Sequence, residues 1–419
     1  MAGHSVRAVR SVLSALLVVA VLALTAVPGR AVTILRDPDI EHALRQLALP
    51  LINSAGLSPN IRVLVVRDSK LNAFVVDTRA VFIHSGLILK AKNAAEIQAV
   101  IAHELAHIAN GHITRRMSNA RAASRGALLG LVIAAAVGAS TGSGEAAAGL
   151  AIGSQNTANR LFLAHTRAEE ASADQAALRY LALNKIDPTA MSDVLAYFSG
   201  QELLSAARQD PYVRSHPLTR DRIRAVRGYA AAYKGVAEPN PTADYWFARA
   251  KGKLGAFLQG SSFTLRKVGK RDGSDIAVMR RAIAYHRTPD PKRAVSEINK
   301  LANMRPNDPF VHELRGQILL ETRNFGAAVQ AYGRAFELAP RNSLILAGYG
   351  RSLLQLNTRD GNARALQVLR DARTRDGRDP RLMIDLANAY ARAGNNGMAS
   401  LVTAERYALV GNLKTALVH

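Results

Sequence analysis

The chain of 419 residues has no cysteine, a single tryptophan and few aromatic residues of any kind. The absence of cysteine excludes disulfide bonds, thiol catalysis and zinc sites built on thiolates. Aromatic residues make up 5% of the sequence and apolar residues 48%. Ala, Leu and Val must therefore supply most of the core, which favours helices. The length is sufficient for two or three domains.

Negative charge is also scarce. The sequence has 32 acidic residues against 55 Lys and Arg, which gives a net charge of +23. Such a surface suits nucleic acid, anionic lipid or acidic polypeptide as a partner. The basic residues are scattered, however, and no RNA- or DNA-reading motif is present. We therefore expect a solvated basic surface and no nucleic-acid partner.

The N-terminus has the layout of a secretory signal. Arg7 and Arg10 precede the uncharged stretch 11–27, and Gly29 and Ala31 stand where small residues mark a cleavage site. We predict a signal peptide over residues 1–31 and export to a bacterial periplasm. The apolar run is long for a signal and short for a membrane span. The alternative is an N-terminal membrane anchor.

The next hundred residues predict a helix, short strands and a second helix. Residues 36–60 have apolar side chains at helical spacing, at Ile40, Leu44, Leu47 and Leu51. Residues 60–68 and 73–86 are rich in Val, Ile and Phe and interrupted by Asp, Ser and Gly, which is typical of strands.

Asn93 is a candidate N-cap of the second helix, with Glu96 three residues later. This helix has an apolar stripe at Ile97, Ile101, Leu105 and Ile108. We expect the stripe to be buried and the opposite face to open onto a cleft.

Residues 128–153 are apolar on both sides of a Gly/Ser-rich break, and each arm is too short to cross a bilayer. They predict a helical hairpin, which is either packed into the core or a membrane-touching or lid element. Residues 168–205 predict a further helical stretch. Two prolines within 238–245 indicate a domain boundary, so we expect a first domain over 32–237 and a linker with a connecting helix over 238–277.

The C-terminal part, residues 278–419, repeats itself. Pro306 and Pro340 are 34 residues apart, and Gly316 and Gly350 share this period. The period and the stretch 325–340 match a tetratricopeptide repeat. Three to four helix pairs are expected, with residues 357–362 (NTRDGN) as an insertion in the third repeat. Stacked pairs leave a concave face for peptide or protein partners.

The central helix carries a pattern with a clear chemical meaning. His103 and His107 are four residues apart, so both imidazoles can reach one ion. Zinc binds His nitrogen, needs a third protein ligand and keeps a fourth position open for water. Glu104 is placed to take a proton from that water and to pass it to the leaving amine.

The third ligand must come from elsewhere in the chain. His112 follows His107 by five residues, whereas the extended three-histidine pattern places its third ligand after six. Glu170 and Asp174, four apart on a predicted helix, are better candidates. Glu170 can bind the metal, and Asp174 can accept the N–H of a ligating histidine, with His103 the best candidate.

His216 precedes Pro217 in a predicted loop before a basic helix. A donor at this position can stabilise the developing oxyanion of a tetrahedral intermediate. The alternative is a loop histidine with no role.

The stretches HELAHIANGH (103–112), TRAEEASAD (166–174) and SHPLTRDRI (215–223) together resemble the signature of zinc endopeptidases related to HtpX and the CAAX prenyl protease. With the signal sequence and the repeats, the chain resembles their periplasmic branch, the β-barrel assembly-enhancing (BepA-type) proteases. The resemblance implies one zinc ion held by His103, His107 and Glu170, with Glu104 as general base. It also implies that Asp174 supports a ligand and that His216 is a regulatory or transition-state residue.

The expected fold is therefore mainly α with a small β-sheet (α+β): a zincin-type peptidase domain followed by a tetratricopeptide α-solenoid. The resemblance implies that residues 72–74 (NAF) form a strand beside the active site. It further implies an envelope endopeptidase that degrades misfolded or stalled proteins and assists their assembly. Its partners are then unfolded envelope proteins, the outer-membrane assembly machinery and, peripherally, the membrane. The alternative is a tetratricopeptide chaperone or scaffold whose protease domain is silent or gated.

Overall fold

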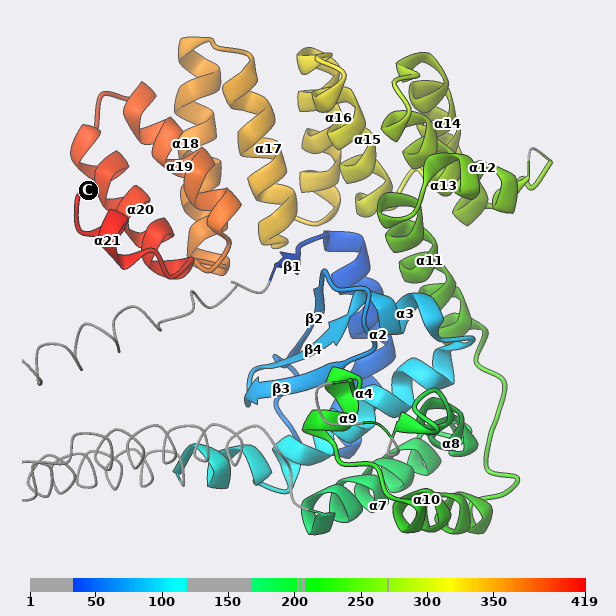
Figure 1. Ribbon diagram of the computed structural model, residues 1–419. Helices are drawn as coiled ribbons and strands as arrows, with labels where there is room; N and C mark the ends of the chain where they lie inside the picture. Colours follow the sequence, from blue (N-terminus) through cyan, green and yellow to red (C-terminus); the bar gives the residue numbers. More distant parts are fainter. Residues whose placement is uncertain (1–32, 119–166, 202–203, 205–207, 270) are drawn as a thin grey trace, which may run out of the picture.

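The computed structural model describes residues 33–118, 167–201, 204, 208–269 and 271–419 (Figure 1). The signal peptide expected over 1–31 and the hairpin expected over 128–153 lie outside these ranges. Among the described residues, no helix combines the length and the apolar character required to cross a membrane.

The N-terminal part folds into a small sheet packed among helices (Figure 1). The sheet has the order β1-β2-β4-β3, with β2 and β4 parallel and the other neighbours antiparallel, so β3 is an edge strand. The elements are β1 (Ile34–Leu35), α2 (Pro38–Ser54), β2 (Arg62–Val66), β3 (Ala73–Asp77), β4 (Ala80–His84), α3 (Ser85–Lys90), α4 (Ala94–Ala109), α7 (Arg167–Leu183), α8 (Thr189–Ala196), α9 (Pro211–Ser215) and α10 (Arg220–Ala232).

Local sequence explains where the first helices begin. The carboxylate of Asp37 caps α2 by accepting from two backbone N–H groups of its first turn, and Pro38 supplies the φ angle that this turn needs. Asn93 caps α4 by accepting from the N–H of Glu96 at 3.0 Å. The apolar positions of both helices are buried in one core together with the sheet.

The helical stretch expected over 168–205 is interrupted. It forms α7 and α8, and the chain turns between them at Lys185, which has a φ of 57°. Pro188 lies directly before α8 and has no N–H to continue the helical ladder. This turn lets α8 fold back so that it contacts both α4 and α10.

The C-terminal part is a row of antiparallel helix pairs that arches over the sheet (Figure 1). This arrangement confirms the mainly α fold with a small sheet and a repeat solenoid. Its elements are α11 (Pro241–Leu258), α12 (Ser261–Val268), α13 (Asp275–Arg287), α14 (Pro291–Met304), α15 (Pro309–Glu321), α16 (Phe325–Leu338), α17 (Ser343–Gln355), α18 (Arg359–Arg375), α19 (Pro380–Arg392), α20 (Asn396–Leu409) and α21 (Leu413–Ala416).

The length of the repeat changes because one helix is longer, and not because of an inserted loop at residues 357–362. The side chains of Asp308, Asn342 and Asp379 cap the first helix of successive pairs. Asp308 and Asn342 are 34 residues apart, whereas Asn342 and Asp379 are 37 residues apart. The three extra residues belong to α18, which has 17 residues where α16 has 14. The insertion expected over residues 357–362 is therefore a longer helix.

The side chain of Tyr332 packs between helices of neighbouring repeats. Tyr332 of α16 is buried, and its ring lies against the backbones of Gly316 in α15 and Gly348 in α17. A Cβ atom added at Gly316 would meet the ring at 2.5 Å, and one at Gly348 at 2.3 Å. The two glycines therefore provide the space in which the ring sits.

Helix α11 joins the two parts of the molecule through buried charges. Arg249 lies 2.7 Å from Asp39 at the start of α2 and 2.6 Å from Asp308 in the solenoid. Lys253, with no exposed surface, lies 2.9 Å from Asp37 and 3.7 Å from Glu313 of α15. The segment expected as a linker thus contributes ionic contacts to both sides.

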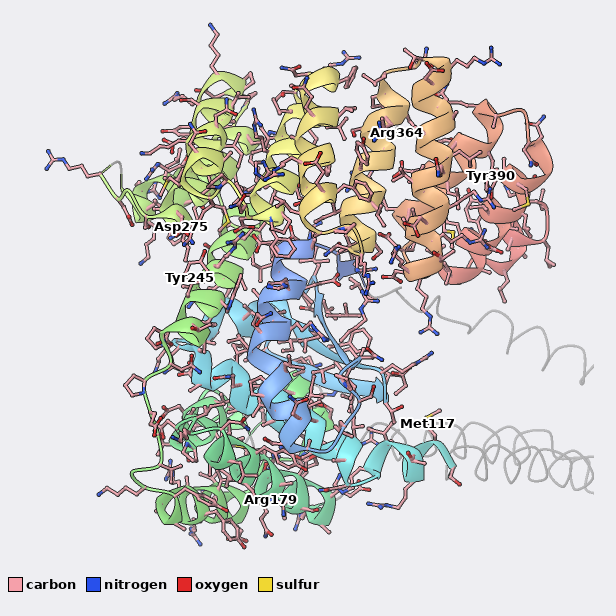
Figure 2. The ribbon with its side chains drawn as sticks, turned by 180° about the vertical axis from the view of Figure 1, so that it is seen from behind. Met117, Arg179, Tyr245, Asp275, Arg364 and Tyr390 are labelled. Carbon is pink, nitrogen blue, oxygen red and sulfur yellow. The ribbon has the colours of Figure 1, made fainter. Side chains whose placement is uncertain are left out.

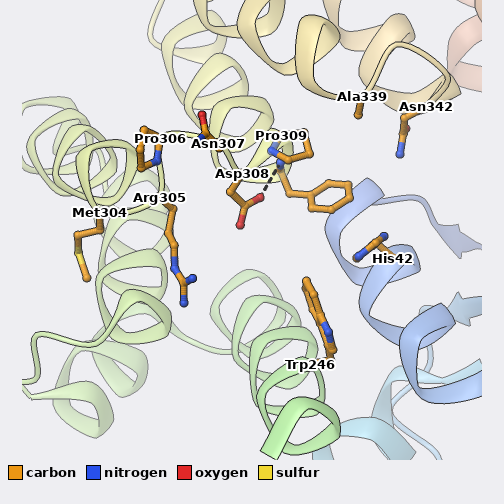
Figure 3. Close-up of a pocket in the computed structure, with 11 residues that line it drawn as sticks. His42, Trp246, Met304, Arg305, Pro306, Asn307, Asp308, Pro309, Ala339 and Asn342 are labelled. Carbon is orange, nitrogen blue, oxygen red and sulfur yellow. Dashed lines mark hydrogen bonds between the residues drawn. The ribbon is translucent and has the colours of Figure 1, made fainter.

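Figure 2 shows where α11 meets the solenoid: Tyr245 and Asp275 lie close together, and the Tyr245 hydroxyl donates to Asp275 at 2.9 Å. Beside this junction, His42, Trp246 and Phe310 line a pocket of about 680 Å³ (Figure 3). A larger cleft of about 1020 Å³ lies between the solenoid and residues of the sheet that include Asp77 of β3 and Phe82 of β4.

Candidate metal centre

The histidine pair of α4 lies on one side of the helix. The Nε2 atoms of His103 and His107 are 3.1 Å apart, as expected for residues separated by one helical turn. Their residues are only 1% and 0% exposed. The face that we expected to open onto a cleft is therefore buried, because side chains from other elements cover it.

Helix α7 brings Glu170 to this pair. Its carboxylate oxygens lie 3.5 Å from Nε2 of His103 and 3.4 Å from Nε2 of His107. The two helices, α4 and α7, pack directly on each other. A carboxylate more than sixty positions away in the sequence thus reaches the histidine pair.

His216 completes the group. It was expected only as a hydrogen-bond donor in a loop, but it lies within the donor group itself. Its Nδ1 atom lies 3.0 Å from Glu170 and 3.3 Å from Nε2 of His103. Donor atoms of His103, His107, Glu170 and His216 all lie within 4.8 Å of one another.

Backbone and stacking contacts fix the position of His216. The residue is the C-cap of α9, and its N–H donates to the carbonyl of Tyr212. Its ring stacks on that of Tyr212, with centroids 4.6 Å apart. Tyr212 stacks in turn on Phe198, so an aromatic column holds the imidazole in place.

Asp174 supports the first histidine from behind. Its carboxylate lies 2.9 Å from Nδ1 of His103. Arg222 of α10 donates to both oxygens of Asp174, at 2.6 and 2.9 Å, and lies 2.5 Å from Glu170. Sequence reasoning missed Arg222, although it stands six residues after His216 in the stretch 215–223.

His112, considered from the sequence as a third ligand, lies outside the donor group. Its Nδ1 atom instead lies 2.9 Å from Nδ1 of His107. It therefore supports His107 on the side away from Glu170, much as Asp174 supports His103. The five-residue spacing places it behind the ring and not beside it.

Glu104 lies next to the group and is completely buried. One of its oxygens is 3.4 Å from Nε2 of His216. Neither oxygen accepts a hydrogen bond from the described residues. Burial raises the pKa of this carboxyl, and the electrostatic interactions with His216 and His103 oppose that effect. Glu104 is therefore suited to accept and hold a proton.

The electrostatics of the group favour a cation. Burial alone would lower the pKa of His103, but Asp174 and Glu170 raise it to about 9. Although burial acts in the opposite direction, electrostatic interactions with His216 and Arg222 hold the pKa of Glu170 well below its usual range. Carboxylates that stabilise a protonated ring also stabilise a cation beside it.

The donor chemistry fits a transition metal ion. When His103 donates its Nδ1–H to Asp174 and His107 donates to His112, both Nε2 atoms are left as lone pairs that face each other. The two Nε2 lone pairs and the carboxylate of Glu170 repel one another at this short range, and a positive charge between them removes the repulsion. Two imidazoles and one carboxylate are a ligand set that zinc takes in hydrolytic enzymes.

Comparison with known proteins agrees with this geometry. Residues 35–230 match Peptidase family M48. A Vibrio cholerae protein named as a beta-barrel assembly-enhancing protease is 30% identical over 222 residues, which cover 52% of this chain and 44% of that protein. The Beta-barrel assembly-enhancing protease of Escherichia coli K12 is 22% identical over 396 residues, 92% of this chain and 78% of the relative.

The chain thus spans less than half the length of the Vibrio cholerae relative. Among solved structures, two of MamA cover 40% and 39% of this chain at 17% and 18% identity, with TM-scores of 0.32 and 0.33.

Proposed function

We propose that this chain, in which residues 35–230 match Peptidase family M48, is a zinc-dependent endopeptidase of the cell envelope. The observation that supports this best is the convergence of His103, His107 and Glu170 beside the carboxylate of Glu104, which accepts no hydrogen bond from the described residues. This arrangement provides ligands for one zinc ion and a base within reach of it.

Glu104 is the proposed general base. A zinc ion bound by His103, His107 and Glu170 would supply a polarised water and Lewis-acid activation of the substrate carbonyl. Glu104 takes the proton of the attacking water, because its buried carboxylate has no competing hydrogen bond among the described residues. The same carboxyl then gives the proton to the amine that leaves.

Asp174 and Arg222 keep the ligands in position. The carboxylate of Asp174 lies 2.9 Å from Nδ1 of His103. In this proposal it accepts the Nδ1–H and so fixes the tautomer with a lone pair on Nε2. Arg222 binds both Asp174 and Glu170. The guanidinium thereby aligns the two carboxylates of α7 with respect to each other.

His216 has two roles in this proposal. At rest it fills the fourth position of the donor group, where the attacking water has to bind. When it moves aside, its ring is close enough to Glu104 and the ligands to donate to the developing oxyanion. The enzyme is then closed until a substrate displaces His216.

The substrates are proposed to be misfolded or stalled proteins of the outer membrane and periplasm. The relatives named as assembly-enhancing proteases support this class. The strand β3 packs against α4 and is an edge strand of the sheet that the described residues form. This edge is proposed to pair with an extended substrate through backbone hydrogen bonds. The solenoid is proposed to dock the outer-membrane assembly machinery, and residues 1–31 to direct export to the periplasm.

The position of His216 also favours a second candidate function. A site held shut by its own side chain is compatible with a chaperone or scaffold that uses the solenoid and cleaves only rarely. The two candidates differ in whether purified protein hydrolyses unfolded polypeptide, and one substitution separates them.

That substitution is Glu104→Gln, tested in the full chain with casein as an unfolded substrate. Wild-type protein should cleave casein, lose activity with a chelator and regain it with zinc. Glu104→Gln should keep its zinc, measured by mass spectrometry, and lose at least about 100-fold in rate. Wild-type protein that binds zinc, prevents aggregation and cleaves nothing would support the chaperone instead.

A further inference from the structure

Arg116 is a half-buried arginine near the metal centre that the mechanism above does not use. It lies on the helical residues 112–118, one turn after His112. Residues four apart on a helix share a face, and His112 is in contact with His107. Arg116 therefore lies on the face of this segment that is directed towards the metal centre.

Its guanidinium is not satisfied by the residues around it. The Nη2 atom is buried, and no described residue accepts a hydrogen bond from it. Burial lowers the pKa of Arg116 against the opposing charges of Glu169, Glu170 and Glu104. The side chain thus interacts electrostatically with the acidic groups of the centre, but Nη2 forms no hydrogen bond with them.

The two carboxylates of α7 at the centre, Glu170 and Asp174, are already engaged by other side chains. Glu170 is held by Arg222 at 2.5 Å and by His216 at 3.0 Å. Arg222 also binds Asp174 through both oxygens. With a divalent cation bound and the histidines neutral, the positive charges around the centre outnumber the negative ones. The cation contributes two positive charges and three arginines contribute one each, against four carboxylates: Arg115, Arg116 and Arg222, and Glu104, Glu169, Glu170 and Asp174. The loaded site would therefore carry a net positive charge, and Nη2 of Arg116 is a buried donor that can bind an acceptor of the substrate.

We propose that Arg116 is a specificity-determining residue that binds an acidic side chain of the polypeptide substrate next to the scissile bond. A guanidinium presents paired N–H donors in a plane that matches a carboxylate. The subsite rests on the proposed peptidase function and adds a substrate preference to it: unfolded segments with Asp or Glu beside the cleaved bond are preferred over neutral ones.

Arg115 provides a matched comparison. It precedes Arg116 but is 59% exposed, donates to the carbonyl of Asn110 at 3.1 Å and lies 3.9 Å from Glu169. Replacing Arg115 removes the same charge from the same segment without touching the buried donor.

The experiment uses zinc-loaded full chain and casein, with cleavage sites mapped by mass spectrometry. Wild-type protein should show Asp or Glu enriched at one position beside the cleaved bond. Matched peptides with Glu or Gln at that position should differ about tenfold in kcat/KM. Arg116→Ala should bring this ratio close to one, Arg116→Glu should favour Lys or Arg, and Arg115→Ala should retain the wild-type ratio.

An unchanged Glu/Gln ratio in Arg116→Ala, or an equal loss in Arg115→Ala, would overturn the subsite. Loss of cleavage only at chain ends would assign Arg116 to a terminal carboxylate and also overturn it. If Arg116→Ala does not fold, Arg116→Lys serves instead: it keeps the charge but loses the planar pair, and the ratio should fall. Wild-type protein that cleaves nothing would refute the peptidase function itself, which is a separate result.

Discussion

The Nδ1 atom of His103 lies 2.9 Å from the carboxylate of Asp174, on the opposite side of the ring from the donor group. This contact shows that α7 reaches the histidine from two directions, with Glu170 in front and Asp174 behind. One helix therefore places both a candidate ligand and the residue that orients a second ligand.

We expect unequal effects from the two carboxylates of α7. Glu170→Ala removes a donor from the group and should strongly reduce zinc content. Asp174→Asn leaves all donors in place and should weaken zinc affinity by about 10–100-fold. Zinc titration against a competing chelator measures both. Glu169→Gln, which changes a neighbouring carboxylate outside the donor group, is the control, and equal losses in all three variants would contradict the assignment.

His216→Ala should make the enzyme faster on casein, because it frees the fourth position of the donor group. If the open arrangement is populated about one tenth of the time in the wild type, the gain is about tenfold. Initial rates at saturating zinc measure it. A large fall in kcat with unchanged zinc content would instead show that the oxyanion role outweighs the closing role.

The junction between the two parts should weaken as pH rises. Burial raises the pKa of Glu313 to about 7, while Lys253 opposes the shift. The folded state therefore binds this proton more tightly than the unfolded chain. The stability contribution is present below about pH 4.5 and is lost as pH rises through about 7.

Glu313→Gln mimics the protonated form and should remove this dependence, with a difference on the order of 1–3 kcal/mol at pH 8. Trp246, the single tryptophan, lies beside the junction, so its fluorescence during urea unfolding reports the change. The exposed Glu337→Gln is the control. Equal pH profiles for wild type and Glu313→Gln would refute the prediction.

The central repeats should tolerate no side chain at Gly348. Alanine there meets the ring of Tyr332 at 2.3 Å, and overpacking of this kind costs about 1–3 kcal/mol. Gly326→Ala, an exposed helical position with no atom within 4 Å of the added Cβ, should stabilise by about 0.5–1 kcal/mol. Urea unfolding followed by circular dichroism compares them, and a neutral Gly348→Ala would mean that the ring moves freely.

Local sequence signals predicted the N-terminal elements well. The apolar spacing in residues 36–60 and the Asn93 cap correspond to α2 and α4, and the Val-rich stretches to β2, β3 and β4. These signals work because period and capping depend on neighbouring residues. The break between α7 and α8 was missed, although Pro188 marks it, because the flanking residues on both sides are good helix formers.

For the candidate site, residue chemistry predicted which side chains converge but not how deeply they lie. The spacing of His103 and His107 and the acidic pair of α7 suggested a shared ion. Burial of the histidine face and the clamp by Arg222 depend on how α10 packs on α7. That packing is tertiary, and the 215–223 stretch carries no periodic signal for it. The domain boundaries and the roles of the site residues stay predictions.

The depth of the donor group has a consequence for which proteins are cut. His103, His107, Glu104 and Glu170 are at most 1% exposed, so a peptide bond has to enter the protein to reach them. A stably folded protein offers no slack chain for this, whereas a protein that has failed to fold does. Under the proposed function, the enzyme would spare finished barrels simply because they do not fit.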